Sequence, residues 1–348
     1  MTDSIKSLNI SDLESLMVEL DQPKYRAKQI YEWIHTHNAD SYDDMTNLPK
    51  SLRSSLSDLY PLKSLTIKDR HISGDGTIKY LIALSDGNLT ESVAIFDDSE
   101  SENKSRVTGC ISSQAGCPLK CEFCATGHQG FIRNLTSDEI VSQISLISND
   151  ISRRIDNVVL MGQGEPFLNY KEVIKAIRRM NQDKGINIGA RHITVSTSGI
   201  IDGIYDFSEE PEQFRLAISL HSVNQSTRNK LMPRLSGQPL HSLKNALKYY
   251  NDVKGRRITL EYLMLDGIND SYDDLNRLID FCSDLNIYVN ILKFNPIKDS
   301  PFKASPDSKI NEWISSLNEN GIVTSLRKSK GQDIAGACGQ LITQTIQD

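Results

Sequence analysis

Apolar residues near the start of the chain recur at helical spacing. Leu and Met form a stripe over residues 13–20, after a Ser11 and Glu14 pair that is typical of a capping box. Pro23 and Pro49 suit the first turns of a second and a third helix. We therefore expect three short helices with little core of their own.

The period then changes from helical to strand-like. TIKYLIAL (77–84) and TESVAIF (90–96) are separated by the turn signal SDGN, and SGDG precedes the first of them. This pattern predicts a small antiparallel meander.

Further along, short apolar runs alternate with amphipathic helical segments. The runs are VTGCIS (107–112), NVVLM (157–161), HITVST (192–197), RLAISL (215–220), RITLEYLML (257–265) and YVNILKF (288–294). Such alternation is typical of parallel βα units, and about six of them predict an α/β fold with a partial (βα)6 barrel. We expect a helical accessory domain over 1–61, a β-meander linker over 62–105 and the barrel over 106–348, with its chemistry at the C-terminal ends of the strands.

Composition and charge narrow the class of protein. The 348 residues are 38% hydrophobic and 24% charged, with a formal net charge of -6, which argues against coating nucleic acid by bulk electrostatics. The polar N-terminus lacks the features of an export peptide, and no apolar run is long enough to span a bilayer. We expect a soluble, cytoplasmic chain, without membrane contact and monomeric.

Four of the six cysteines lie between residues 110 and 124. Cys117, Cys121 and Cys124 form C-x3-C-x2-C directly after the first barrel strand, and three soft thiolates on one loop favour an iron-sulfur cluster with one open iron. Zinc is the alternative, with Cys110 or His128 as fourth ligand, although zinc sites more often use separated pairs. No further cysteine follows at ferredoxin spacing, which disfavours a closed electron-transfer cluster.

CPLKCEFC resembles the cluster loop of the radical S-adenosylmethionine (SAM) superfamily, including the aromatic Phe123 before the third cysteine. GQGEP (162–166) looks like the superfamily's motif that meets the methionine amino group. The resemblance implies a radical SAM barrel, a [4Fe-4S] cluster held by Cys117, Cys121 and Cys124, and SAM as a cofactor.

More specific blocks resemble the bacterial adenine C2-methyltransferases that act on both 23S ribosomal RNA and transfer RNA. These blocks are CISSQAGC, CATGHQGFIRNLT, STSGI, AISLHS, EYLMLDGIND and DIAGACGQL, with PKYRAKQIYEWI and YDDMTNLPKSLR in the helical module. The resemblance implies methylation of adenosine 2503 in 23S rRNA and adenosine 37 in tRNA. It also implies two SAM molecules per turnover and electrons from flavodoxin or ferredoxin.

The same resemblance assigns roles to individual residues. Cys338 matches the cysteine that carries the methyl group, Cys110 the partner that resolves the protein-RNA adduct as a disulfide, and Glu91 the base that removes the C2 proton. Contacts to SAM are implied for Gly164, Glu165, Ser196, Ser219, Leu220, His221 and Asn295. Gln163 and Phe167 depart from the pattern, since many relatives have Met and Leu there. Cys282 is expected to be a buried small hydrophobe.

RNA contacts are harder to predict. The candidates are Arg178, Arg179, Arg256, Arg257 and the runs 228–234 and 326–330, of which we favour LRKSK at 326–330 because it leads into the Cys338 segment. Two alternative functions stay open. One is methylation of the same ribosomal adenosine at C8, and the other is a non-catalytic iron-sulfur electron carrier that binds RNA.

Overall fold

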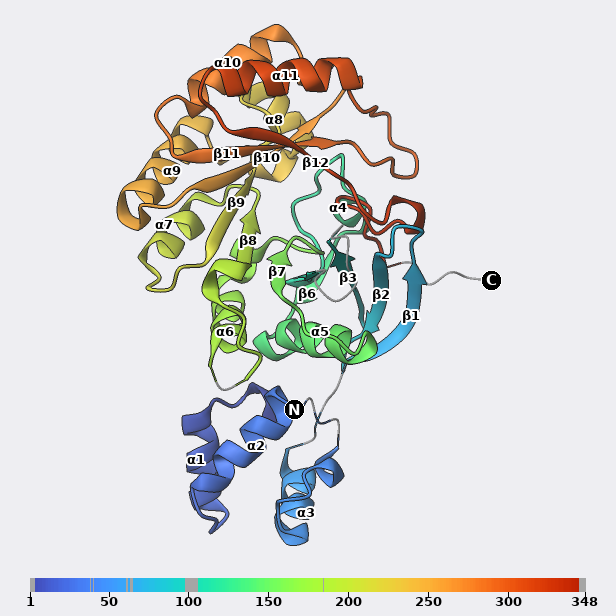
Figure 1. Ribbon diagram of the computed structural model, residues 1–348, viewed down its shortest axis with the longest axis vertical. Helices are drawn as coiled ribbons and strands as arrows, with labels where there is room; N and C mark the ends of the chain where they lie inside the picture. The colour runs from blue at the N-terminus through green and yellow to red at the C-terminus, as the bar shows by residue number, and fades with distance from the viewer. Residues whose placement is uncertain are drawn as a thin grey trace.

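A computed structural model describes residues 4–37, 39, 41–60, 62, 65–97, 106–183 and 185–343 of the chain. These residues form two bodies, a small helical one and a larger one built on a curved sheet (Figure 1). The helices are α1 (Ile10–Glu19), α2 (Tyr25–His35), α3 (Lys50–Leu59), α4 (Ala125–Gln129), α5 (Ser137–Asp150), α6 (Tyr170–Asn181), α7 (Ile201–Glu209), α8 (Gln225–Leu231), α9 (Leu240–Lys254), α10 (Tyr272–Cys282) and α11 (Asp307–Glu319). The strands are β1 (Thr66–Ile72), β2 (Ile78–Ala83), β3 (Leu89–Phe96), β4 (Val107–Cys110), β5 (Gln114–Gly116), β6 (Phe131–Asn134), β7 (Asn157–Leu160), β8 (Ile193–Thr197), β9 (Arg215–Ser219), β10 (Ile258–Met264), β11 (Ile287–Lys293) and β12 (Thr324–Arg327).

The three predicted N-terminal helices are present, but they enclose a core of their own. Residues between the helices, such as Met45 and Leu48, pack with Leu13 and Leu56 in a cluster separate from the barrel core. The expectation of little core was therefore wrong. Helix α1 also begins earlier than predicted, because Asn9 and not Ser11 is its N-cap and forms the capping box with Asp12.

The larger body contains one ten-stranded sheet in the order β1-β2-β3-β4-β7-β8-β9-β10-β11-β12. Strands β1 to β4 are antiparallel, whereas β4 and β7 to β12 run parallel to one another. Helices α5, α6, α7, α9, α10 and α11 connect the parallel strands and lie on the outer face of the sheet (Figure 1). The six predicted runs are all strands, and the α/β open barrel is confirmed.

The meander is continuous with the barrel. Strand β3 pairs with β4, so that Val93 lies opposite Cys110, and Tyr80 and Ile82 belong to the same hydrophobic core as the barrel strands. The loop in which the sequence places the boundary, 98–105, lies outside the described residues. Within the described part of the chain, no helix has the length and apolar character needed to cross a membrane.

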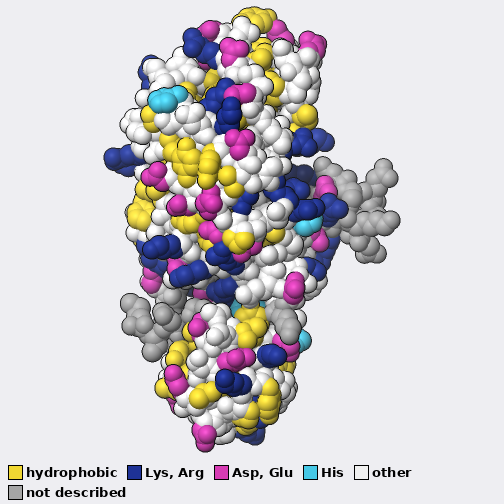
Figure 2. Space-filling view, turned by 90° about the vertical axis from the view of Figure 1, so that its left-hand side faces the viewer, with side chains coloured by type: hydrophobic (Ala, Val, Ile, Leu, Met, Phe, Trp, Pro, Cys, Tyr) yellow, Lys and Arg dark blue, Asp and Glu magenta, His cyan; other side chains and the backbone are white. Residues whose placement is uncertain are grey.

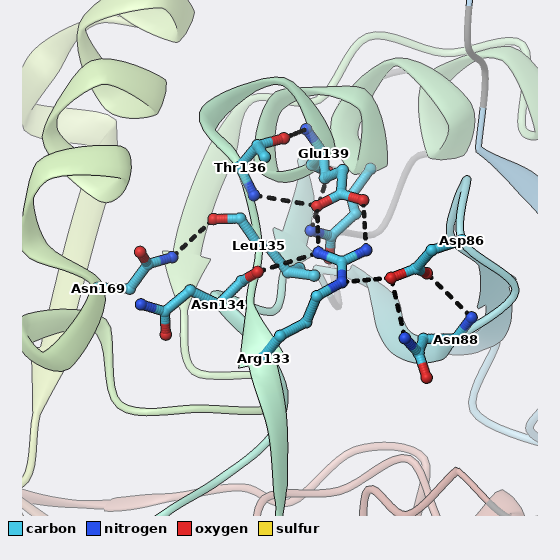
Figure 3. Close-up of polar contacts among 9 residues, drawn as sticks. Asp86, Asn88, Arg133, Asn134, Leu135, Thr136, Glu139 and Asn169 are labelled. Atoms are coloured by element: carbon cyan, nitrogen blue, oxygen red, sulfur yellow. Dashed lines mark hydrogen bonds and ion pairs between the residues drawn. The ribbon is translucent and has the colours of Figure 1, made fainter. Parts of the chain in front are cut away.

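An ionic network fixes the segment that follows the cysteine loop (Figure 3). Arg133 on β6 makes two hydrogen bonds of 2.7 Å to the carboxylate of Glu139, and it also contacts Asp86 in the β2–β3 turn. Glu139 in turn completes the capping box of α5 with Thr136. Because the guanidinium group is planar and bidentate, this network holds the antiparallel pair β5 and β6 in place against α5 and the β2–β3 turn.

After β12 the chain forms a segment that we call the C-terminal strap, residues 331–343. The N–H of Gly331 donates to Asp75 (2.9 Å) and the N–H of Gly74 donates to Asp333 (3.0 Å), in the turn between β1 and β2. Strands β1 and β12 are the two edges of the sheet. The strap therefore bridges the open side of the barrel, beside α4 and the ends of β1 and β2 (Figure 1).

Candidate active site

A cavity of about 250 Å³ lies at the C-terminal ends of the parallel strands, with the strap as one wall. Most of the predicted site residues line it, namely Cys110, Cys117, Cys121, Cys124, Gly164, Glu165, Ser196, Ser219, His221, Asn295 and Cys338. A larger hollow of about 880 Å³ lies between the helical body and the barrel, but no cysteine lines it. Chemistry rather than size therefore identifies the site.

The cysteine loop is held tightly against the barrel. The N–H of Cys117 donates to the carbonyl of Gly130 (2.8 Å), and the N–H of Glu122 donates to the carbonyl of Leu231 (3.0 Å). A Cβ at Gly127 would lie 2.8 Å from the backbone of Cys121, so only glycine lets α4 begin this close to the loop. These contacts with the rest of the protein fix the conformation of the cysteine loop.

Burial dominates the electrostatics of the three loop thiols. It raises the pKa of Cys117 to about 12 and also raises the pKa values of Cys121 and Cys124, while backbone N–H groups oppose the shift at Cys117 and Cys124. Bound metal displaces such protons, and N–H groups aimed at sulfur stabilise the thiolates. In the described residues, no three His, Cys, Asp or Glu side chains converge closely enough to hold a single metal ion. The donor set, three sulfurs spread along one loop of the cavity, fits an iron-sulfur cluster.

The GQGEP loop presents Glu165 to the cavity. Its carboxylate accepts backbone N–H groups from Phe167 (3.0 Å) and Ser198 (2.7 Å), while burial raises its pKa. A Cβ at Gly162 would lie 2.7 Å from Ile111, and Gly164 has φ +105°. The protein itself therefore requires these glycines, independently of a ligand.

His221 follows β9 with a φ of +56° and is buried. Its Nδ1 accepts the N–H of Leu263 (3.1 Å), and burial together with the charge of Arg228 lowers its pKa to about 3. The neutral ring must then carry its proton on Nε2. This arrangement offers a hydrogen-bond donor to the cavity.

The remaining predicted SAM contacts differ in position. Ser196 and Ser219 lie at the ends of β8 and β9 and line the cavity. Leu220 does not line it, because its side chain is fully buried in the barrel core. The Asn295 amide donates to the carbonyl of Cys338 (3.0 Å) and accepts from Gln332 (2.7 Å), so it anchors the strap.

The two predicted catalytic cysteines have contrasting environments. Cys338 lies on the strap and is exposed, whereas Cys110 at the end of β4 is 7% exposed. Burial first, and then the nearby Cys338, raise the pKa of Cys110 to about 12, against the effect of Arg327. All six cysteines of the chain are free, so the implied disulfide is not a feature of this structure. Cys282 is buried in the main core, as expected.

Glu91 on β3 is buried and does not line the cavity. Its side chain is 4% exposed, with Lys79 Nζ 3.3 Å from one carboxylate oxygen. The other oxygen accepts the N–H of Ile342 on the strap (2.8 Å). The base implied by the resemblance is thus linked directly to the segment that carries Cys338.

The candidate phosphate contacts differ in accessibility, and the exposed ones, such as Arg257 and Lys328, stay predictions. Arg179 and Arg228 are buried, and Arg178 is paired with Glu210 and Glu212. Arg327 points into the cavity, where its Nη1 lies 3.4 Å from Glu261. No pattern in the sequence distinguishes these inward arginines from solvated ones.

Arg228, which the sequence analysis placed in a run of candidate phosphate contacts, lies instead beside Cys121 of the cysteine loop, outside the cavity lining. It is fully buried on α8, it donates to the carbonyl of Ser198, and its Nε and Nη1 have no partner among the described residues. Burial lowers its pKa to about 10, while the adjacent Cys121 opposes that shift. A buried guanidinium group with two free donors beside the cysteine loop is suited to an anionic ligand.

Comparisons with known proteins agree with this geometry. Residues 111–282 match a family model described as the Radical SAM superfamily, and residues 4–61 match the Ribosomal RNA large subunit methyltransferase N-terminal domain. The chain is 39% identical over 346 residues to a probable dual-specificity RNA methyltransferase RlmN of Thermoanaerobacter sp., covering 99% of both chains. It is 41% identical over 341 residues to the one of Staphylococcus haemolyticus, covering 97% of this chain and 92% of that one.

A solved structure is similar over the whole length. The crystal structure of a radical SAM methyltransferase from Sphaerobacter thermophilus superposes with a TM-score of 0.92 at 38% identity, covering 97% of this chain and 98% of that one. Both bodies of the molecule are therefore found in a single known protein.

Proposed function

Because the chain belongs to the RlmN family of radical SAM RNA methyltransferases, we propose that it methylates C2 of adenosine in both 23S rRNA and tRNA. The observation that supports this most is the placement of Cys338. It is exposed to solvent and also lines the cavity of the three loop cysteines, so one sulfur can meet both a cofactor and an RNA base.

In this proposal Cys117, Cys121 and Cys124 hold the [4Fe-4S] cluster. When bound, the cluster supplies the electron that cleaves SAM to a 5'-deoxyadenosyl radical. Glu165, Ser196, Ser219 and His221 contribute hydrogen-bonding groups for SAM around the same cavity.

The chain's own residues divide the remaining work. Cys338 accepts a methyl group from one SAM molecule, loses a hydrogen atom from that methyl group, and joins its carbon to C2 of adenine. The adduct radical gives up one electron, which would return to the cluster, and Glu91 takes the C2 proton. The Cys110 thiolate then displaces the base carbon from the Cys338 sulfur and so closes the disulfide, and the released carbon takes up a proton to complete the methyl group. Adenine C2 is electron-poor, which makes direct attack on a sulfonium methyl group unfavourable and favours this radical route.

RNA would reach Cys338 from the solvent side of the strap. On the face shown in Figure 2, Lys and Arg side chains are interspersed with Asp and Glu over both bodies, which fits a net charge of -6. We propose that local contacts near the strap, rather than a uniformly basic surface, hold the RNA. We further propose that the chain acts as a monomer with a flavodoxin or ferredoxin as electron donor.

The test is an anaerobic reaction of the reconstituted protein with reductant, SAM and unmodified rRNA or tRNA. 2-Methyladenosine formed by the wild type and absent with Cys338→Ala is the expected result. 8-Methyladenosine would instead establish the alternative C8 activity. 5'-Deoxyadenosine without methylated RNA would overturn the substrate assignment, and no consumption of SAM would indicate an electron carrier.

A further inference from the structure

One face of the meander carries an ordered row of side chains that leads to Cys110. Register pairs His71 on β1 with Lys79 on β2, Lys79 with Val93 on β3, and Val93 with Cys110 on β4. Paired residues of antiparallel strands point to the same face. Glu91 is two residues from Val93 and therefore shares this face, diagonal to Lys79.

The carboxylate of Glu91 is enclosed on this face. Its exposed fraction is 4%, and that of Lys79 is 11%. Val93, Cys110 and Leu341 pack together beside it, so the strap covers the row. An isolated carboxylate in such a place would be costly to ionise, because burial disfavours the charged form.

Lys79 provides the compensating charge. Its Nζ lies 3.3 Å from Oε1 of Glu91, while Oε2 accepts the N–H of Ile342 at 2.8 Å. Each carboxylate oxygen thus has a different partner, one on β2 and one on the strap. We propose that Lys79 is a positioning residue for Glu91, whose ammonium group keeps this carboxylate ionised and directed at the strap that carries Cys338.

The inference rests on the proposed role of Glu91 as the base. A base must be ionised before it can take a proton, and a carboxylic acid at this site would be unable to do so. Burial raises the pKa of Glu91, and Lys79, the N–H of Ile342 and the more distant His71 act against it. Among the other titratable groups on these elements, Asp69 pairs with His71 and Cys110 is a buried thiol. Arg70 and Tyr80 contact Asp150, Lys68 is exposed, and on the strap Asp333 accepts from Gly74 while Cys338 is exposed.

Removing the lysine charge should leave Glu91 protonated over a wider pH range. A neighbouring opposite charge commonly lowers a carboxyl pKa by about 1–3 units. In Lys79→Gln, the acidic limb of the single-turnover pH profile for 2-methyladenosine should therefore move to higher pH by about one to three units. Lys79→Arg should restore the wild-type limb, and Lys68→Gln, an exposed lysine on β1, should not move it.

Two measurements separate this inference from the proposed function. 5'-Deoxyadenosine is formed before the base acts, so Lys79→Gln and Glu91→Gln should both still form it while product declines. Product formation by Glu91→Gln at the wild-type rate would overturn the base assignment itself. If Glu91→Gln blocks product formation but the acidic limb of the pH profile is the same in Lys79→Gln as in the wild type, only the proposed role of Lys79 is refuted.

A spectroscopic readout covers the case in which Lys79→Gln turns over poorly at every pH. The infrared band of the protonated Glu91 carboxyl, assigned by its loss in Glu91→Gln, should titrate at higher pH in Lys79→Gln than in the wild type. Titration at the same pH in both proteins would overturn the proposal.

Discussion

Replacing Gly164 by alanine should destabilise the protein before any ligand binds. The residue has φ +105°, and a Cβ there would lie 2.7 Å from Cβ of Gln114 and 2.8 Å from its backbone nitrogen. Gln114 is unable to move aside, because its side chain accepts the N–H of Glu165 (2.9 Å) and donates to Asn134 (2.8 Å). The backbone conformation costs alanine about 1–3 kcal/mol and the crowding adds about 1–3 kcal/mol.

A second glycine separates these two contributions. Gly255 ends α9 at φ +61°, and a Cβ added there would have no atom within 4 Å, so Gly255→Ala should cost only the backbone conformation, about 1 kcal/mol. Gly164→Ala should therefore lose about 1–5 kcal/mol more than Gly255→Ala. The excess comes mainly from crowding against Gln114.

The assay is equilibrium urea unfolding of the ligand-free protein, followed by tryptophan fluorescence. The chain has two tryptophans, Trp33 in the helical body and the buried Trp313 on α11. A Trp33→Phe background lets Trp313 report the barrel alone, which avoids mixing the transitions of the two bodies. Equal losses of stability in Gly164→Ala and Gly255→Ala would refute the reasoning. Contact with a ligand would then be the remaining reason for a glycine at position 164.

Other perturbations test the cavity and the strap. Arg228→Leu removes a buried charge with two free donors, so the ligand-free protein should unfold at the same or higher urea while iron content after reconstitution falls; lower ligand-free stability would contradict this. Gln163→Met should speed amide exchange at 341–343, because Gln163 and the N–H of Thr343 share Gln129 Oε1; unchanged exchange would count against it. Arg133→Lys should cost about 1–3 kcal/mol in the Trp313 transition by losing the bidentate contact to Glu139, and wild-type stability would refute the network. Iodoacetamide at pH 8 should label Cys338 well before Cys110, whose pKa of about 12 leaves about one thiolate in ten thousand; peptide mass spectrometry showing equal labelling would contradict the burial argument.

Periodicity was sufficient to predict the larger elements of the fold. Buried parallel strands are continuous runs of apolar residues, so the hydrophobic pattern alone was enough to locate all six of the predicted strands. Strand β12 was missed because TSLR has one apolar residue, and its pairing with β11 depends on tertiary context. The core of the helical body was underestimated for a similar reason, since Met45 and Leu48 contribute to it from outside the helices.

The candidate site was predictable where spacing carries the chemistry. Three cysteines within eight residues must share one loop, and strand-end residues of a parallel sheet must share one edge. No sequence pattern indicates in which direction a long side chain points. Arg228 and Arg327 look like solvated charges in the sequence, yet one is buried beside Cys121 and the other lies near Glu261.

The contrast between the two thiols proposed as catalytic, Cys338 and Cys110, gives the proposed cycle its order. Cys338 is exposed on a strap held by hydrogen bonds with Asn295, Ala125 and Glu91, so it can accept a methyl group and then meet RNA. Cys110 is buried opposite Val93, where its high pKa keeps it a thiol at neutral pH. A thiol is a poor nucleophile, so Cys110 neither competes for the methyl group nor closes a disulfide early. In the proposed cycle, adduct resolution by Cys110 therefore follows methyl transfer to Cys338.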